Sequence, residues 1–394
     1  MILKPIKIMN VRRFICLVTL LIFSITTVFG QNNKADSLSL PQSTPKETPK
    51  VISYPKFRFG GLFQGRFISS LNDDIDINGQ ANLNNEGTLN TFQVKYARVQ
   101  MRANISERTE IFILTNFADQ NKILENASIK YQISPKLALQ IGQFRPWFGI
   151  EETIPLDVMK SLDRSNQYTE FGKLGWTSFQ IGSALLGESK IGNIPFQYSV
   201  AVVNGNGRNQ IKDNDNGKLF SSRVNFNILK NNLLNVGING GIGKAFEKTV
   251  HTYAADIETE ITINSRWNLN LALEAKNAIN HTLYHQLNES TRGDIEDYQI
   301  RGFYILPDFR YALGPNSRNI TAIEFSCRYE IIDHNYKIDS NPKQTFMPMV
   351  GLEFLKNYGA RIQIGARIDR YKHENIAQNL QNNNLLILQV QTRF

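Results

Sequence analysis

The sequence predicts an all-β protein, a transmembrane antiparallel β-barrel of about 16 strands with short periplasmic turns and long extracellular loops. Segments of about ten residues alternate between apolar and polar side chains, which is the period of a strand with two different faces. Very short turns alternate with long polar connections, an asymmetry typical of such barrels. The last segment, LLILQVQTRF, would leave an open apolar edge prone to aggregation, and barrel closure pairs that edge.

The amino terminus has the pattern of an export signal. Four basic residues precede an apolar run over 14–29, and they are Lys4, Lys7, Arg12 and Arg13. This predicts a signal peptide over 1–30 that is cleaved before Gln31; the alternative is an uncleaved anchor, for which the run is short. Residues 31–55 are polar and contain four prolines, so we expect a flexible periplasmic leader. Residues 56–394 are assigned to the barrel.

Composition excludes several classes of protein. The chain has 44 basic and 35 acidic residues, and removal of the four basic residues of the signal leaves an excess of only five. No basic block accompanies it, so no nucleic-acid partner is expected. Cys327 is the single cysteine after residue 30, which excludes an internal disulfide and a thiolate metal cluster. No apolar run near 18 residues follows residue 30, which excludes a helical membrane protein.

Sixteen strands account for the alternating segments. They are predicted at 57–70, 91–104, 109–118, 125–133, 136–144, 176–186, 195–203, 218–229, 232–243, 251–264, 267–277, 297–313, 319–332, 345–356, 359–370 and 385–394. In the second strand the outward parity changes near Ala97, which predicts a β-bulge. Long polar connections are predicted at 71–90, 145–175, 204–217, 244–250, 278–296, 333–344 and 371–383, with both termini on the short-turn side.

The alternation also predicts which face meets lipid. In 267–276, Trp267 and Leu271 share one face, whereas Asn270, Glu274 and Lys276 share the other. A packed interior with such charges would be costly, because an unpaired buried charge destabilises a protein by several kcal/mol or more. We therefore expect the apolar face to contact lipid and the charged face to line a water-filled lumen. A secreted soluble β protein is the alternative.

Two segments carry a family resemblance. Residues 141–152 read IGQFRPWFGIEE, and residues 161–165 read SLDRS. This resembles the phosphate-selective porin O and P family of Gram-negative outer membranes, in which a Gly-Gln-Phe-basic segment leads into Phe-Gly-x-Glu and then an acidic-Arg-Ser step. That family usually has proline two places after the basic residue, where this chain has Trp147 and its Pro146 stands one place earlier.

The resemblance implies an outer-membrane channel without a cofactor. It would be a sixteen-stranded barrel, usually a homotrimer, in contact with the lipid bilayer and lipopolysaccharide. Anions or other small solutes would cross it by diffusion.

Strand parity places a set of basic residues in the lumen. They are Arg58, Arg66, Arg98, Arg102, Lys130, Arg223, Arg310, Arg328, Arg361 and Arg367. Guanidinium groups suit phosphate or carboxylate because they donate paired hydrogen bonds in a fixed fork. A row of them could draw anions through a pore. Acidic residues share the lumen, so mutual ion pairing that merely stiffens a general pore is the alternative.

The long connection at 145–175 is the candidate constriction. We expect it to fold into the lumen and narrow it with opposed charges, which are Arg145, Glu151, Glu152, Asp157, Lys160, Asp163 and Arg164. The alternative is a surface loop ordered by its own ion pairs.

Metal and enzyme signatures are weak. His281 and His285 lack the glutamate of a helical zinc motif, and DIDING at 74–79 is followed by Asn85 where a calcium loop needs glutamate. No metal, cofactor or nucleophile elbow is predicted. The expected function is passive diffusion of small solutes, with a preference for anions or phosphate left open. The alternatives are a barrel whose external loops bind a partner or surface polymer, and an outer-membrane hydrolase.

Overall fold

The computed structural model describes residues 53–82, 86–210, 212–229, 234–314, 317, 319–375 and 380–394. The predicted signal peptide at 1–30 and residues 31–52 of the predicted leader lie outside the described residues.

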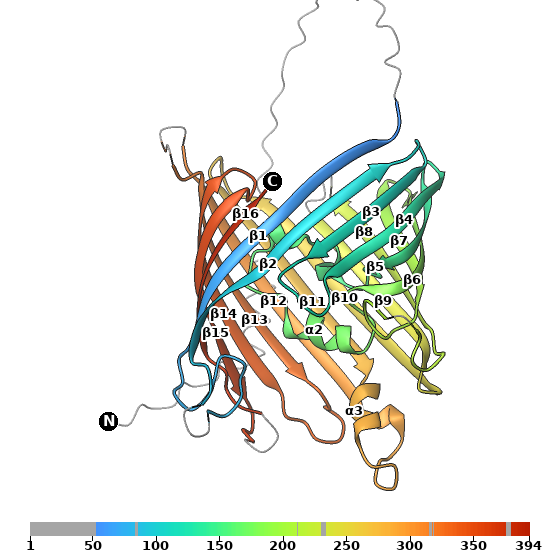
Figure 1. The fold of residues 1–394 in the computed structure, drawn as a ribbon, viewed down its shortest axis with the longest axis vertical. Helices are drawn as coiled ribbons and strands as arrows, with labels where there is room; N and C mark the ends of the chain where they lie inside the picture. The colour runs from blue at the N-terminus through green and yellow to red at the C-terminus, as the bar shows by residue number, and fades with distance from the viewer. Residues whose placement is uncertain are drawn as a thin grey trace, which may run out of the picture. The chain divides into compact units, whose positions relative to one another are not determined.

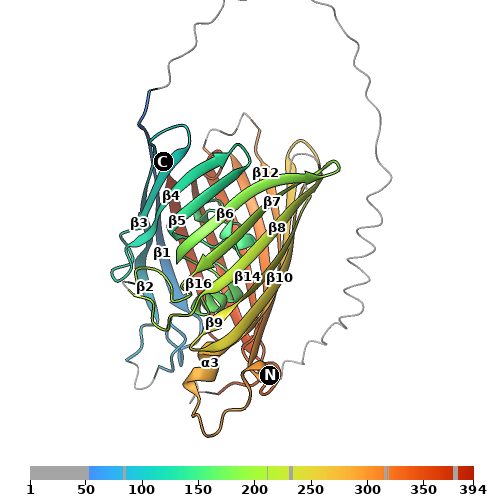
Figure 2. The same cartoon turned by 90° about the vertical axis from the view of Figure 1, so that its right-hand side faces the viewer.

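Sixteen strands of the described chain form one closed antiparallel barrel (Figures 1 and 2), which confirms the predicted fold class. They are β1 (Lys56–Ser70), β2 (Asn90–Asn104), β3 (Thr109–Asn116), β4 (Leu124–Ser134), β5 (Leu137–Phe144), β6 (Gln180–Ile191), β7 (Ile194–Val203), β8 (Leu219–Leu229), β9 (Leu234–Ala245), β10 (Lys248–Thr262), β11 (Trp267–Ile279), β12 (Gln299–Ala312), β13 (Ala322–Asp333), β14 (Lys343–Leu355), β15 (Ala360–Tyr371) and β16 (Leu385–Arg393).

The terminal strand closes the barrel because both of its edges are paired. Leu388 lies opposite Phe67 of β1 and opposite Ile364 of β15. Closure therefore leaves neither edge of β16 open, as expected from its apolar sequence.

The helices of the described residues lie in connections between strands. They are η2 (Ile150–Glu152), η3 (Leu156–Val158), α2 (Asn166–Lys173), α3 (His281–Gln286) and η5 (Ile295–Asp297). Across the described residues, no helix combines the length and apolarity that a membrane crossing requires.

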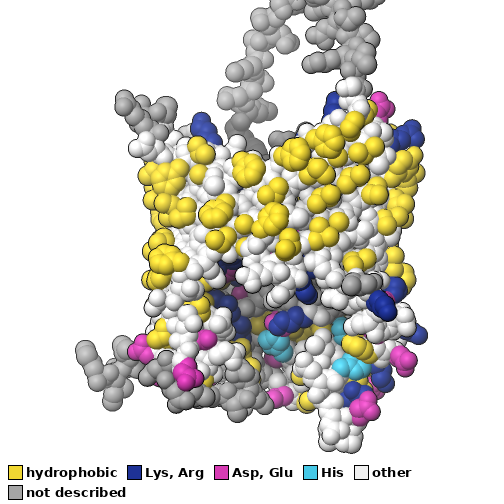
Figure 3. Space-filling view, in the orientation of Figure 1, with side chains coloured by type: hydrophobic (Ala, Val, Ile, Leu, Met, Phe, Trp, Pro, Cys, Tyr) yellow, Lys and Arg dark blue, Asp and Glu magenta, His cyan; other side chains and the backbone are white. Residues whose placement is uncertain are grey.

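The two faces of the wall follow the predicted alternation. On β15, Ile364 is 48% exposed on the outside, whereas the neighbouring Gln363 is fully buried inside. On β11, Asn270, Glu274 and Lys276 are buried on the lumen side. Figure 3 shows apolar side chains over the outer wall and charged ones gathered at the end that carries the long connections. This is the surface of a protein whose solvent is a bilayer.

Two predicted details are wrong in position, and a third is confirmed. The connection at 244–250 is a two-residue hairpin turn, in which Phe246 and Glu247 both have positive φ, as tight turns matched to strand twist require. Strand β6 begins at Gln180 rather than 176, because Trp176 and Phe179 are buried inside the barrel. The predicted bulge near Ala97 is confirmed: it lies at Lys95, which has no partner opposite the consecutive residues Gln64 and Gly65 of β1.

The lumen is not water-filled throughout, contrary to the prediction. The connection between β5 and β6, residues 145–179, brings Phe148, Phe171 and Trp176 inside, where they form a buried cluster with inner-wall residues of β5 to β13. The wall accepts them because small side chains such as Ala201 and Ala278 face the lumen there. One part of the bore is thus a packed core.

A candidate constriction inside the barrel

The connection 145–179 folds into the barrel and lies in its lumen (Figures 1 and 2, green), and we call it the plug segment. Its entry requires unusual backbone: Trp147 has φ 63° and Gly149 has φ 96°. A Cβ at position 149 would lie 2.3 Å from Glu274 Oε1, so only glycine fits there. Ser165 caps α2 by accepting a hydrogen bond from the Tyr168 amide at 3.1 Å.

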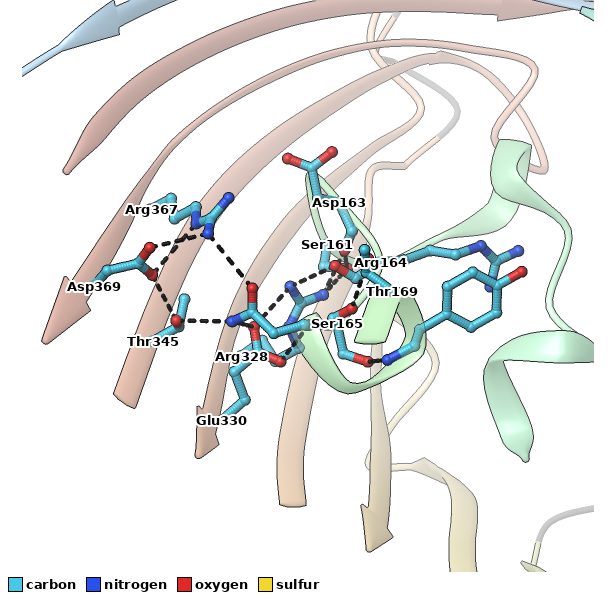
Figure 4. Close-up of polar contacts among 12 residues, drawn as sticks. Ser161, Asp163, Arg164, Ser165, Thr169, Arg328, Glu330, Thr345, Arg367 and Asp369 are labelled. Carbon is cyan, nitrogen blue, oxygen red and sulfur yellow. Dashed lines mark hydrogen bonds and ion pairs between the residues drawn. The ribbon is translucent and has the colours of Figure 1, made fainter. Parts of the chain in front are cut away.

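The SLDRS turn of this segment, residues 161–165, lies against the inner faces of β13, β14 and β15 (Figure 4). Arg328 donates to Ser161 Oγ at 2.9 Å, to the Arg164 carbonyl at 3.0 Å and to the Asp163 carbonyl. At the start of α2, the Asn166 amide donates to Glu330 Oε2 at 2.8 Å. Charge-assisted hydrogen bonds of this kind are about twice as strong as neutral ones, so they hold the turn firmly.

A second group of wall residues holds the middle of the segment. Arg66 donates to the Leu162 carbonyl at 2.8 Å and pairs with Asp163 at 3.1 Å, and Lys95 contacts the same carboxylate. Arg361 donates to the Met159 carbonyl at 2.7 Å. These basic side chains therefore face the lumen, but their hydrogen bonds and ion pairs are made with the plug segment.

A buried ion pair holds the beginning of the segment. Glu274 pairs with Lys276 at 3.2 Å, and both side chains are inaccessible to solvent. Glu274 also accepts hydrogen bonds from the Ile150 amide at 2.7 Å and from Gln167 Nε2 at 2.9 Å. A buried pair needs such extra partners to offset its desolvation.

Two cavities flank the plug segment beside β2 to β6. The extracellular one, about 1170 Å³, opens among the long connections, and the periplasmic one, about 650 Å³, reaches the short-turn end at Phe394. Four residues line both cavities: Arg98, Arg145, Leu156 and Phe179. We call these four residues the neck, because the linings of the two cavities share them.

Both charged residues of the neck are arginines. Arg98 pairs with Glu125 at 2.6 Å, and Arg208 shares that carboxylate at 3.2 Å. Arg145 donates to the Glu152 carbonyl at 3.3 Å and lies 4.9 Å from the Phe179 ring. No carboxylate of the described residues lies within 4 Å of its guanidinium nitrogens.

The surroundings of the neck disfavour negative charge. Burial raises the pKa of the Glu152 carboxyl, even though Arg145 and Arg164 oppose that shift. Burial and the nearby Arg164 lower the pKa of Arg145, but an arginine stays protonated in proteins. The charged side chains that line both cavities are therefore both cationic.

The other predicted lumen bases are each paired with a wall carboxylate. Arg58, Arg102 and Lys130 all contact Glu110, and the remaining pairs are Arg223 with Asp256, Arg310 with Glu353 and Arg367 with Asp369. Within the segment, Glu151 accepts from the Ser165 amide at 3.0 Å, Arg164 donates to the Ile154 carbonyl at 3.0 Å, and Asp157 pairs with Arg393. Lys160 lines a separate recess of about 570 Å³.

Sequence reasoning missed several residues of this site. Lys95 sits at the bulge, so the change of parity in β2 was a usable signal for it. Arg208, Leu156 and Phe179 come from connections, where no period assigns a side. Their positions depend on how the plug segment folds.

The weak metal signatures have other partners in the structure. Nε2 of His281 lies 3.2 Å from the Leu174 carbonyl, and the His285 ring packs against Phe246. Asp76 accepts from the backbone amides of Asn78 and Gln80, which closes a local turn, while Asn85 lies outside the described residues.

A closed sixteen-stranded barrel with an apolar outer wall and a lumen narrowed by a folded-in connection has the architecture of an outer-membrane porin. The chain belongs to the phosphate-selective porin O and P family, whose model matches residues 72–394. No curated protein sequence matches it.

Solved porin structures share this fold. The chain is similar to an anion-selective porin from Comamonas acidovorans, with 8% identity, a TM-score of 0.55, and coverage of 86% of this chain and 100% of that one. For the outer membrane channel DcaP of Acinetobacter baumannii the values are 12%, 0.54, 86% and 97%. For OmpT of Vibrio cholerae in a trimer form they are 11%, 0.51, 87% and 100%. At such identities the likeness shows the fold alone.

Proposed function

We propose that this porin passes small anions by passive diffusion and that the neck sets its ion preference. The observation that carries the proposal is that Arg98 and Arg145 are the two charged residues lining both cavities. A solute that crosses from one cavity to the other therefore passes two guanidinium groups.

The partners of these two arginines determine how strongly they act on a solute. Arg98 forms an ion pair with Glu125, whereas Arg145 is held by carbonyl oxygens and forms no ion pair within 4 Å among the described residues. Field lines concentrate where low-dielectric walls approach, so one such charge at a constriction acts more strongly than several at a wide mouth. A single guanidinium also binds an anion weakly enough to release it.

Inorganic phosphate is one candidate for the permeating anion, because the family description names it. Guanidinium donors match its oxygen geometry, although they accept carboxylates equally well. We further propose a homotrimer in the outer membrane, in contact with lipid and lipopolysaccharide and exported through the predicted cleaved signal peptide. The trimer form of the similar Vibrio cholerae porin supports this assembly.

The test is the reversal potential of the reconstituted porin in a potassium chloride gradient. We expect chloride to be preferred, and we expect R145Q to lower the chloride-to-potassium permeability ratio roughly fivefold, the factor for about 1 kcal/mol of charge interaction. R145E should invert the preference.

R370Q is the matched control, because Arg370 is exposed at the extracellular rim and bonds Asn384 there. It removes the same charge far from the neck and should leave the ratio unchanged. A cation-selective parent protein, or an R145Q variant with the parent ratio, would reject the proposal.

A further inference from the structure

Three cations gather around one carboxylate in the periplasmic cavity. Glu110 lies 3.2 Å from Arg58, 3.0 Å from Arg102 and 3.4 Å from Lys130. The pairing leaves two positive charges without a counter-charge in this cluster. The three cationic side chains remain partly exposed, so an incoming anion can reach them.

An exposed indole belongs to the same cavity. Of the six aromatic residues in the plug segment, five are at most 8% exposed, whereas Trp147 is 37% exposed. Trp147 holds this position in a left-handed backbone conformation, φ 63°, that a bulky residue adopts only at a cost of about 1–3 kcal/mol. Strained conformations of this kind persist where the surrounding structure enforces them, and they are concentrated at functional sites.

The two features meet on one surface. Arg102, Lys130 and Trp147 all line the periplasmic cavity of about 650 Å³. Lys130 and Trp147 also line an adjoining cavity of about 390 Å³. Arg102 is oriented by Phe112, whose ring centre lies 3.7 Å from its guanidinium carbon. Volumes of about 300–1,000 Å³ are typical of small-molecule sites.

From this arrangement we infer that the periplasmic cavity is a binding site for small aromatic carboxylates. The carboxylate group is received by Arg102 and Lys130, and the ring stacks on the Trp147 indole. The inference deepens the proposed anion function by naming a solute class. Besides Glu110, two acids line the cavity, but Asp157 pairs with Arg393 and Glu152 accepts a hydrogen bond from the Ser178 amide at 2.5 Å.

The aromatic ring is what separates this class from inorganic anions. An indole open to water in a polar cavity gains little from phosphate or acetate, whereas an aromatic ligand covers it and adds a stacking interaction. The cations alone would accept any of these anions.

The test is block of chloride current through the full-length porin by benzoate, compared with cyclohexanecarboxylate, which has the same charge and a similar size but no aromatic ring. We expect benzoate to block at the lower concentration. W147G should raise its half-blocking concentration roughly fivefold or more and affect cyclohexanecarboxylate less. Glycine is chosen because it accepts the positive φ at position 147 without strain.

Two further variants make the result specific. W147F keeps a ring and should restore most of the benzoate block. W267A removes an outer-wall tryptophan that packs against Tyr311 and lines neither cavity, and it should leave the benzoate block at the parent value. Equal block by both acids in the parent porin, or an unchanged benzoate block in W147G, would overturn the site.

Failure of the site and failure of the proposed function give different results. Cation preference in potassium chloride together with a Trp147-dependent benzoate block rejects the neck and supports the site. Anion preference that falls in R145Q, together with a benzoate block that does not depend on Trp147, supports the neck and rejects the site.

Discussion

Gly149 shows how one backbone position places the plug segment. Its φ of 96° is unfavourable for any other residue, and its amide donates to Asn239 at 2.9 Å on the inner wall. The absence of a side chain lets Glu274 and Lys276 approach, and Glu274 in turn binds the next amide, that of Ile150.

We therefore predict that G149A destabilises the barrel through this contact. The new methyl group would displace Glu274 and add backbone strain of about 1–3 kcal/mol. The thermal unfolding midpoint in detergent, followed by circular dichroism, should fall. The control is G207A, because Gly207 has φ 89° but faces open space, so it carries the strain without the clash. Equal effects of both substitutions would show that the clash is unimportant.

At the scale of single elements, the outer end of α2 is tied to the β13–β14 connection. Glu170 pairs with Lys173 at 2.8 Å and lies 3.6 Å from His334. Burial raises the pKa of Glu170, but the neighbouring His334 and the hydrogen bond from Lys173 outweigh it and lower the pKa from 4.5 to about 2. The ionised carboxylate therefore stabilises the folded state.

The sign of this shift gives a pH dependence. Because the folded pKa is depressed, the stabilisation is fully present above pH 4.5 and is lost as pH falls towards 2. We expect E170Q to lower the unfolding midpoint at pH 7 and the difference from the parent to shrink across that window. E289Q, which removes an exposed carboxylate paired with Arg292, serves as the control and should leave the midpoint unchanged. A difference that persisted at pH 2 would contradict the role of the charge.

At the scale of the whole molecule, the outside is apolar and the charges lie inside. The wall residues Leu271 and Asn270 are neighbours in sequence, but their side chains face different environments. Asn270 faces the lumen, where it donates to Asp308 at 3.3 Å, and Leu271 lies on the opposite face of β11.

This inversion predicts different costs for lysine at adjacent positions. L271K should destabilise the barrel by about 2–4 kcal/mol if the site lies near mid-bilayer. N270K should cost much less, because its ammonium group reaches the lumen and the Asp308 carboxylate. The free energy of unfolding from liposomes, measured by urea titration, compares the two. Similar costs at both positions would mean that the assignment of faces is wrong.

The wall could be predicted from sequence because its signal is local. A strand alternates with period two, so the side assigned to Ile364 or Gln363 follows from its immediate neighbours. The same rule placed Arg328 and Arg361 on the lumen side, but it could not say what they bind. Their partners, Ser161 and Met159, lie far away in the sequence and in a segment without a period.

The sequence by itself determined the barrel, its strands, its inside and outside, and the family resemblance at 141–165. Tertiary structure alone decided the neck and the packed part of the lumen. The plug segment has several apolar and several charged residues, and which of them face the wall depends on small wall residues such as Ala201 and on buried acids such as Glu274. Those contacts are set by distances across a closed barrel, which no short stretch of sequence encodes.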